Sequence, residues 1–187
     1  MTRSVSPTSS DMSGRSERLS IEPLVIEDAD ELFAALDHPD VGTYIGGPEM
    51  TTVEALRTRI GHLVVGSGRD DEQWLNWVVR TTATDEVIGR LEATVYAGGS
   101  WAEVAYVFDP RRWGHGYAVE SAGWMIDHLR ASGVSELWAA IHPDNGRSIR
   151  LIERLGFIEV PPPPTRAVGS YDEGDLVFVR GRRESTR

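Results

Sequence analysis

The stretch E-V-A-Y-V-F-D-P-R-R-W-G-H-G-Y-A-V-E, residues 103–120, sets a strand, a basic glycine-spaced loop and a helix in succession. Residues 104–108 are mostly β-branched or aromatic and predict a strand, which Pro110 ends. Gly114 and Gly116 let the backbone approach a ligand closely, and the first N–H groups of the following helix have no intrahelical partner. The stretch therefore favours a bound anion, typically a phosphate, although two glycines near a helix start are more often ordinary turn chemistry.

Length and composition indicate one folded domain. The chain has 187 residues, of which 40% are hydrophobic, so it can bury one substantial core. All 19 basic side chains are arginine, which excludes Schiff-base chemistry and a lysine general base. No cysteine is present, so thiolate nucleophiles, disulfides and cysteine zinc sites are excluded as well. The histidines show no metal-ligand spacing, and no metal is expected.

Charge and hydropathy restrict the partners. The formal net charge of -10 argues against nucleic acid as a partner. The sequence has no apolar run of about 18 residues and no signal-peptide pattern, so no membrane association is expected and a cytoplasmic location is the default. The sequence does not indicate the oligomeric state, so both a monomer and a homodimer are compatible with it.

The ends of the chain differ from its middle. Residues 1–18 are rich in Ser and Thr and are expected to be a disordered leader. The domain is expected over residues 19–181, with residues 182–187 as a polar tail. It opens with a strand over 19–26, which Pro23 places at an edge or a bend.

Two helices are expected next, each opened by a capping box. Asp28 with Glu31 forms the first such pair, and Thr51 with Glu54 forms the second. Between the two helices lies a Gly/Pro-rich loop over residues 41–50.

The remaining elements predict an α+β fold. Three strand-like runs with short turns indicate an antiparallel meander over 73–81, 87–96 and 101–108. After the helix that follows the glycine loop come a strand, a helix and a closing strand pair, over 136–141, 145–155, 157–160 and 175–180. We expect a single domain with a mixed, mostly antiparallel central sheet flanked by helices.

Two segments together resemble the GCN5-related N-acetyltransferase (GNAT) superfamily, and more closely its RimJ/RimL branch. R-R-W-G-H-G-Y-A at residues 111–118 matches the R/Q-x-x-G-x-G/A loop of that superfamily. N-G-R-S-I-R-L-I-E-R-L-G-F at residues 145–157 matches the N-x-x-S…L-G-F helix of the branch. The likeness covers roughly residues 17–180, and it implies the GNAT form of the predicted sheet.

The resemblance implies acetyl-CoA as the donor. The pyrophosphate would lie on the backbone N–H groups of the glycine loop, and the pantetheine arm would pair with the end of the preceding strand. The implied cofactor-binding residues are Val107, Phe108, Arg111, Trp113, Gly114, His115, Gly116, Tyr117, Ala118 and Asn145. Asn145 fits an ordinary helix N-cap equally well, and Arg111 with Arg112 could be a solvated surface pair.

Direct acetyl transfer needs a base for the amine and a proton for the departing thiolate. Many GNAT enzymes carry a tyrosine where this sequence has Ile152, so Ser148 is the candidate that hydrogen-bonds or protonates the sulfur. Its alternative is a polar residue in the first helical turn. Glu103 is the first candidate for the base, with an exposed edge glutamate as the alternative, followed by Glu92 and His115.

The acceptor implied by the resemblance is an amine, either a protein N-terminus or a small molecule. Trp74, Trp77, Trp101 and Tyr44 either line the acceptor side or belong to the core. The loop over residues 41–50 is the expected specificity element. Two alternatives to an acetyltransferase are a non-catalytic acyl-CoA-binding module and, less favoured because no P-loop is present, a nucleotide binder.

Overall fold

A computed structural model describes residues 12–44, 51–96, 98–161 and 171–181. Several predictions concern segments outside these ranges: most of the leader, most of the specificity loop and the polar tail.

Eight strands form one sheet within the described residues, in the order β1-β2-β3-β4-β5-β6-β8-β7. Every neighbouring pair is antiparallel except β5 and β6, which are parallel. The strands are β1 Gly14–Arg15, β2 Leu19–Pro23, β3 Glu72–Thr81, β4 Val87–Tyr96, β5 Trp101–Phe108, β6 Glu136–Ile141, β7 Ile158–Val160 and β8 Leu176–Arg180. The predicted single domain with a mixed, mostly antiparallel sheet is confirmed.

Four α-helices and three short 3-10 helices occur in the same ranges. They are η2 Ile26–Asp28, α1 Ala29–Leu36, η3 Gly42–Tyr44, α2 Val53–Val65, η4 Pro110–Arg112, α3 Tyr117–Ala131 and α4 Gly146–Arg154. The helix over residues 145–155 is confirmed to within one residue at each end.

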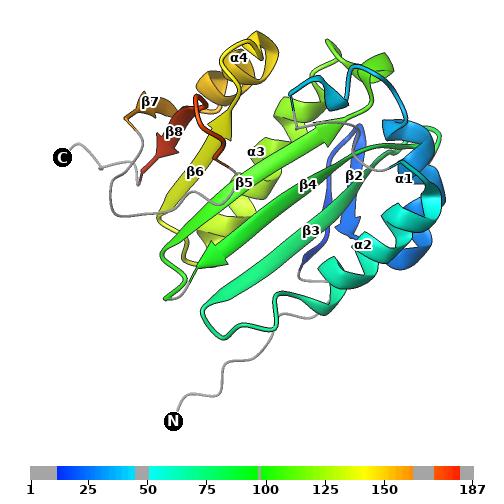
Figure 1. Cartoon of the computed structure of the whole chain (residues 1–187), viewed down its shortest axis with the longest axis horizontal. Coiled ribbons are helices and arrows are strands. Elements are labelled where there is room, and N and C mark those ends of the chain that lie inside the picture. Colours follow the sequence, from blue (N-terminus) through cyan, green and yellow to red (C-terminus); the bar gives the residue numbers. More distant parts are fainter. Residues whose placement is uncertain (1–11, 45–50, 97, 162–170, 182–187) are drawn as a thin grey trace.

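Helices cover the two faces of the sheet separately (Figure 1). α1 and α2 lie in front in this view, where Leu32 and Ile60 share a core with Val78 of β3. α3 lies behind, and its Met125 packs in a larger core with Leu91 of β4. All three helices therefore bury an apolar face against the sheet.

The caps of α1 and α2 differ from the predicted capping boxes. Asp28 stands at the N-cap position of α1, but its side chain makes no capping hydrogen bond there; its carboxylate accepts from Val25 N–H at 3.0 Å and pairs with Arg80 at 2.7 Å. Glu31 pairs with the same guanidinium at 2.8 Å. The largely buried Arg80 offers both carboxylates a charge-assisted bond, which is stronger than a cap to a neutral N–H.

The second helix begins one residue later than predicted. Thr52, not Thr51, accepts from the backbone N–H of Ala55 at 3.1 Å, so Thr52 is the N-cap.

The folded part begins before residue 19, because residues 12–18 pack against the sheet. β1 pairs with β2, and the backbone carbonyl of Met12 accepts from the Trp77 indole at 2.8 Å. A Cβ at Gly14 would lie 2.1 Å from atoms of the Trp124 ring, so glycine permits this contact. The prediction of disorder over this part of the leader is therefore wrong, because specific contacts fix a segment whose composition lacks an apolar pattern.

Candidate functional site

The parallel strands β5 and β6 separate after a short paired segment. β5 pairs with β4 from Ala102 to Phe108, but its described register with β6 covers only Trp101, Ala102 and Glu103. Beyond that point the two strands diverge toward α4 (Figure 1). Backbone N–H and C=O groups on the separated edges can accept an extended ligand as an added strand. We call this opening the β5–β6 split.

A run of unpaired backbone amides follows β5. Within the part of the chain that the structure describes, the N–H groups of residues 114–119 have no protein acceptor. Hydrogen bonding in α3 resumes at Glu120, whose N–H donates to the Gly116 carbonyl at 3.1 Å. Gly114 and Gly116 have φ of +81° and +82°, which glycine adopts without strain. This segment, the amide loop, combines free donors with the positive end of a 15-residue helix and suits an anion.

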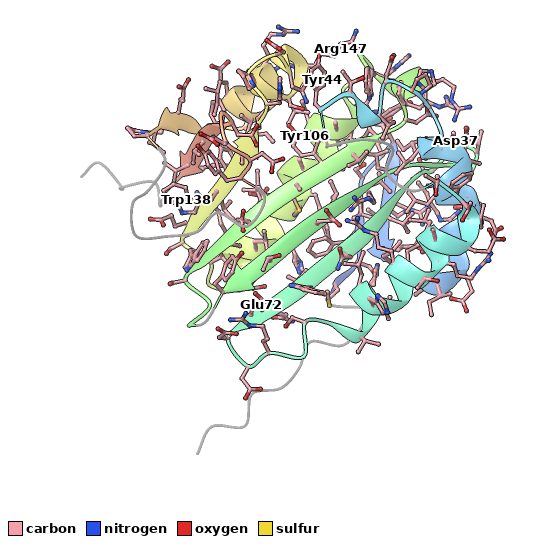
Figure 2. All side chains as sticks on the ribbon, viewed as in Figure 1. Asp37, Tyr44, Glu72, Tyr106, Trp138 and Arg147 are labelled. Atoms are coloured by element: carbon pink, nitrogen blue, oxygen red, sulfur yellow. The ribbon has the colours of Figure 1, made fainter. Side chains whose placement is uncertain are left out.

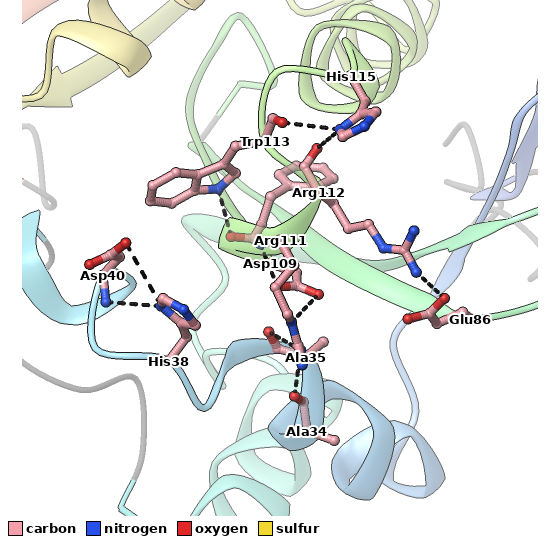
Figure 3. Close-up of polar contacts among 11 residues, drawn as sticks. Ala34, Ala35, His38, Asp40, Glu86, Asp109, Arg111, Arg112, Trp113 and His115 are labelled. Atoms are coloured by element: carbon pink, nitrogen blue, oxygen red, sulfur yellow. Dashed lines mark hydrogen bonds and ion pairs between the residues drawn. The ribbon is translucent and has the colours of Figure 1, made fainter.

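Arg111 and Arg112 are both engaged by carboxylates (Figure 3). Arg111 Nε donates to the two oxygens of Asp109 at 2.8 and 3.0 Å, and Nη2 donates to the Ala34 carbonyl at 2.9 Å. Arg112 pairs with Glu86. Hydrogen bonds to these carboxylates raise the pKa of each guanidinium. Arg111 thus ties η4 to the end of α1, Arg112 lies in a surface pair, and their contact with a cofactor stays a prediction.

Arg18 supports the amide loop from the N-terminal segment. Its Nε donates to Glu120 at 2.8 Å and its Nη1 donates to the His115 carbonyl at 2.9 Å. His115 turns its Nδ1 toward the carbonyls of Trp113 at 3.0 Å and Arg112 at 3.2 Å. The imidazole therefore holds the loop backbone, and its Nδ1 is the protonated nitrogen because both neighbours are acceptors.

Arg147 of α4 reaches the other side of the amide loop. Its guanidinium lies 4.7 Å from the centroid of the Trp113 ring, and the Trp113 indole donates to the Phe108 carbonyl at 2.9 Å. Among the described residues, Arg147 has no carboxylate partner. No linear motif marks this cation, because only its stacking on Trp113 brings it beside the loop.

Asn145 is the N-cap of α4. Its side-chain oxygen accepts from Ser148 N–H at 3.1 Å, so the N-cap alternative is confirmed, while a contact with pantetheine stays a prediction. The Ser148 hydroxyl has no hydrogen-bond partner among the described residues.

Tyr106 spans the β5–β6 split from β5 to α4. Its hydroxyl donates to the Ser148 carbonyl at 3.3 Å. Burial raises the pKa of Tyr106 to about 12. In the sequence, Tyr106 is one residue of the predicted strand, and its one distinguishing signal is a phenol within the strand that leads into the glycine loop.

Glu103 lies on the opposite face of β5 from Tyr106. Only 7% of it is exposed, so the alternative of an exposed edge glutamate is wrong. Its carboxylate accepts from the Tyr96 hydroxyl at 2.6 Å, and the Tyr96 ring stacks on Trp101 with centroids 3.9 Å apart. Burial and this hydrogen bond raise the pKa of Tyr96. A carboxylate in this aromatic setting is suited to proton transfer.

The second candidate base, Glu92, has two cations beside it. It pairs with the buried Arg90 and lies 3.8 Å from Arg59. Glu92 therefore belongs to an ion network that joins β4 to Arg59 of α2.

The predicted acceptor-lining aromatics have different positions. Trp77 is fully buried and belongs to the core. Tyr44 is partly exposed, and its ring centroid lies 5.5 Å from that of His142, which follows β6. Figure 2 shows Tyr44, Tyr106 and Arg147 at the end where β5 and β6 separate. Tyr44 is therefore the predicted aromatic nearest the open end of the split.

Two features are absent from the described ranges. No cluster of His, Asp and Glu there could hold a metal ion. No helix there is long and apolar enough to span a membrane.

Comparison with known proteins adds sequence relatives. A family model described as an acetyltransferase (GNAT) domain matches residues 18–158. The uncharacterized N-acetyltransferase YoaA of Bacillus subtilis is 26% identical over 143 residues, which cover 75% of this chain and 80% of that protein. The uncharacterized N-acetyltransferase p20 of Bacillus licheniformis is 29% identical over 143 residues, with 75% and 79% covered.

Solved structures share the fold at lower identity. RimL, a ribosomal L7/L12 alpha-N-protein acetyltransferase solved with coenzyme A, superposes with a TM-score of 0.74 at 16% identity over 89% of this chain and 96% of that one. A GNAT-family acetyltransferase from Bacillus anthracis gives 0.69 at 21% identity, over 89% and 95%. Since the family model matches well over half of the sequence, the chain belongs to the GNAT acetyltransferase family.

Proposed function

We propose that this protein is an acetyl-CoA-dependent N-acetyltransferase that moves the acetyl group directly from the CoA thioester to an amine. The observation that carries the proposal is the arrangement along one segment: the β5–β6 split opens beside β5, and the amide loop follows directly after β5. CoA combines an extended amide-bearing arm with a diphosphate, so it needs this pair of sites in this order.

The residues of both sites fit CoA chemically. The free amides of residues 114–119 would hold the diphosphate, with Trp113 at the edge of the loop and Arg147 as an added cation. The edge of β5 at Val107 and Phe108 would pair with the pantetheine amides. Asn145 keeps its side-chain nitrogen for the same arm while its oxygen caps α4.

Two side chains would perform the chemistry. Glu103 would take the proton of the attacking amine through a water molecule, and burial in an aromatic setting suits it to that exchange. Ser148 would direct its unpaired hydroxyl to the sulfur. No covalent acyl-enzyme is required, which agrees with the absence of cysteine from the sequence.

The acceptor class is an amine, either a protein N-terminus or a small molecule. The motifs of the RimJ/RimL branch and the fold shared with RimL, which acts on a ribosomal protein, support testing N-terminal peptides first. The loop over residues 41–50, whose described part contains η3 and Tyr44, is the proposed specificity element.

The test is a mass-spectrometric screen of acetyl-CoA with pooled amines and N-terminal peptides. We expect an acetylated product together with stoichiometric free CoA. Glu103→Gln and Ser148→Ala should lower turnover and keep CoA affinity, whereas Glu159→Gln on the exposed side of β7 should leave both unchanged. CoA binding without product across a broad panel would favour the non-catalytic acyl-CoA-binding module instead.

A further inference from the structure

Tyr106 is a hydroxyl that the proposed chemistry has not yet used. It lies on β5, and its hydroxyl bonds across the β5–β6 split to the Ser148 carbonyl at 3.3 Å. That bond joins one wall of the split to the first turn of α4. The distance is long for a hydroxyl donor, so a better acceptor entering the split would readily take the hydrogen bond over.

The helix α4 contains no tyrosine of its own. The position that the GNAT resemblance assigns to an acidic tyrosine holds Ile152, which is 1% exposed and packs in the core. A phenol is a much stronger acid than the aliphatic hydroxyl of Ser148. Its ordinary pKa of about 10 also lies far closer to that of a thiol, about 8.5.

The two faces of β5 separate the two proton transfers. Glu103 and Val107 share the face toward α1 and α2, whereas Tyr106 and Phe108 belong to the core under α3. Glu103 and Tyr106 are three residues apart, about 10 Å along a strand. A thioester in the split would therefore meet a proton acceptor for the amine on one face and a proton donor for the sulfur on the other.

We propose that Tyr106 is a catalytic residue that hydrogen-bonds the departing sulfur and supplies its proton. This inference rests on the proposed acetyl transfer. As the amine nitrogen bonds to the acetyl carbon, the carbon–sulfur bond breaks and its electron pair passes to sulfur, which takes the Tyr106 proton. The surplus amine proton leaves through water to Glu103 and then to solvent, and the tyrosinate regains a proton from solvent. The products are the amide and the free thiol of CoA.

Burial affects the Tyr106 hydroxyl in two ways. With its pKa raised to about 12, Tyr106 stays protonated throughout the neutral range, so it enters the reaction as a hydrogen-bond donor. The same shift makes it a weaker acid than a free phenol, so its proton passes to sulfur only as the carbon–sulfur bond breaks. Ser148 then positions the sulfur, and its carbonyl holds the Tyr106 hydroxyl until the ligand arrives.

The test compares Tyr106→Phe, Ser148→Ala and the control Tyr171→Phe, whose ring lies on the exposed surface. We expect Tyr106→Phe to lower kcat by about 100-fold, within the range of general acid catalysis, with the KM for acetyl-CoA nearly unchanged. Ser148→Ala should lose less, about 10-fold. Tyr171→Phe should behave as the wild type.

A second readout needs no turnover. The thiolate absorbance of bound CoA, followed against pH, should give a thiol pKa about one unit lower in the wild type than in Tyr106→Phe, because only the wild type donates to the thiolate. Equal thiol pKa values, or a kcat loss smaller than that of Ser148→Ala, would overturn the assignment of Tyr106. Failure of the wild type to bind CoA or to acetylate any amine would instead refute the proposed function.

Discussion

Arg147 shows how one side chain can extend a backbone anion site. The amide loop offers N–H donors but no full charge of its own, and the nearby Arg18, Arg111 and Arg112 all have carboxylate partners. Arg147 is instead stacked on Trp113 with no such partner among the described residues. Its charge is therefore available to a phosphate.

Removal of that charge gives a residue-level prediction. Arg147→Gln should weaken CoA binding about 5- to 10-fold, the effect of one charged hydrogen bond at a solvated site, and should not change the affinity for pantetheine. Arg150→Gln, on the same helix and also exposed, is the matched control. Isothermal titration calorimetry of CoA binding to both variants tests this prediction. Equal losses of CoA affinity in the two variants would show that Arg147 does not contribute to the site.

His128 gives a prediction for the pH dependence of stability. It stacks on Trp124 with centroids 5.1 Å apart and meets the Trp77 ring edge to face, and burial lowers its pKa from 6.5. The unfolded chain then binds more protons than the folded one just below pH 6.5, so stability falls as pH decreases through that range. His128→Gln should flatten this slope in denaturant titrations between about pH 5 and 7, while the exposed His62→Gln should retain it.

At the scale of elements, one ion network joins α1 to the sheet. The Arg80 side chain of β3 is 13% exposed and binds Asp28 at 2.7 Å and Glu31 at 2.8 Å. This network replaces the capping box that the sequence predicted. Its carboxylates also hold the turn that begins α1, through the bond from Val25 N–H to Asp28.

Breaking this network should cost more than breaking a surface pair. Arg80→Leu leaves the Asp28 carboxylate, whose side chain is 8% exposed, without its cation, and should lower the free energy of unfolding by about 3 kcal/mol. Arg57→Leu removes the exposed pair with Asp30 and should cost less than about 1 kcal/mol. Urea titrations of both variants check this, and similar losses would show that burial at Arg80 contributes little.

Most elements were predictable because their apolar periods are regular. The meander, β6 and α4 follow patterns of period 2 or 3.6 that burial imposes locally. The ordered structure of residues 12–18 was not predictable from the sequence. Met12 and Gly14 are held by contacts with tryptophans that are distant in the sequence, and the segment has no apolar pattern of its own.

The chemistry of the site was predictable only in part. The amide loop follows from its glycines and the helix start. The hydrogen-bond partners of Arg111, Arg112 and Tyr106 were not predictable. They depend on which residues tertiary packing brings close to these side chains. A linear motif names the residue types and does not contain those partners.

At the scale of the whole molecule, the β5–β6 split and the amide loop lie one after the other along the chain, at and just beyond β5. The net charge of -10 would favour approach of a cationic amine, although it opposes the anionic donor. The concentration of free amides at residues 114–119 therefore has to supply most of the local attraction for phosphate.

The most direct test of the central claim is a residue-resolved NMR titration of backbone amides with CoA. The account predicts saturable shifts at residues 114–119 and at Val107 and Phe108 along β5, with the loop shifts lost when pantetheine replaces CoA. Shifts confined to other regions, or an equal response to ATP at the same concentration, would contradict the assignment of these two sites to CoA.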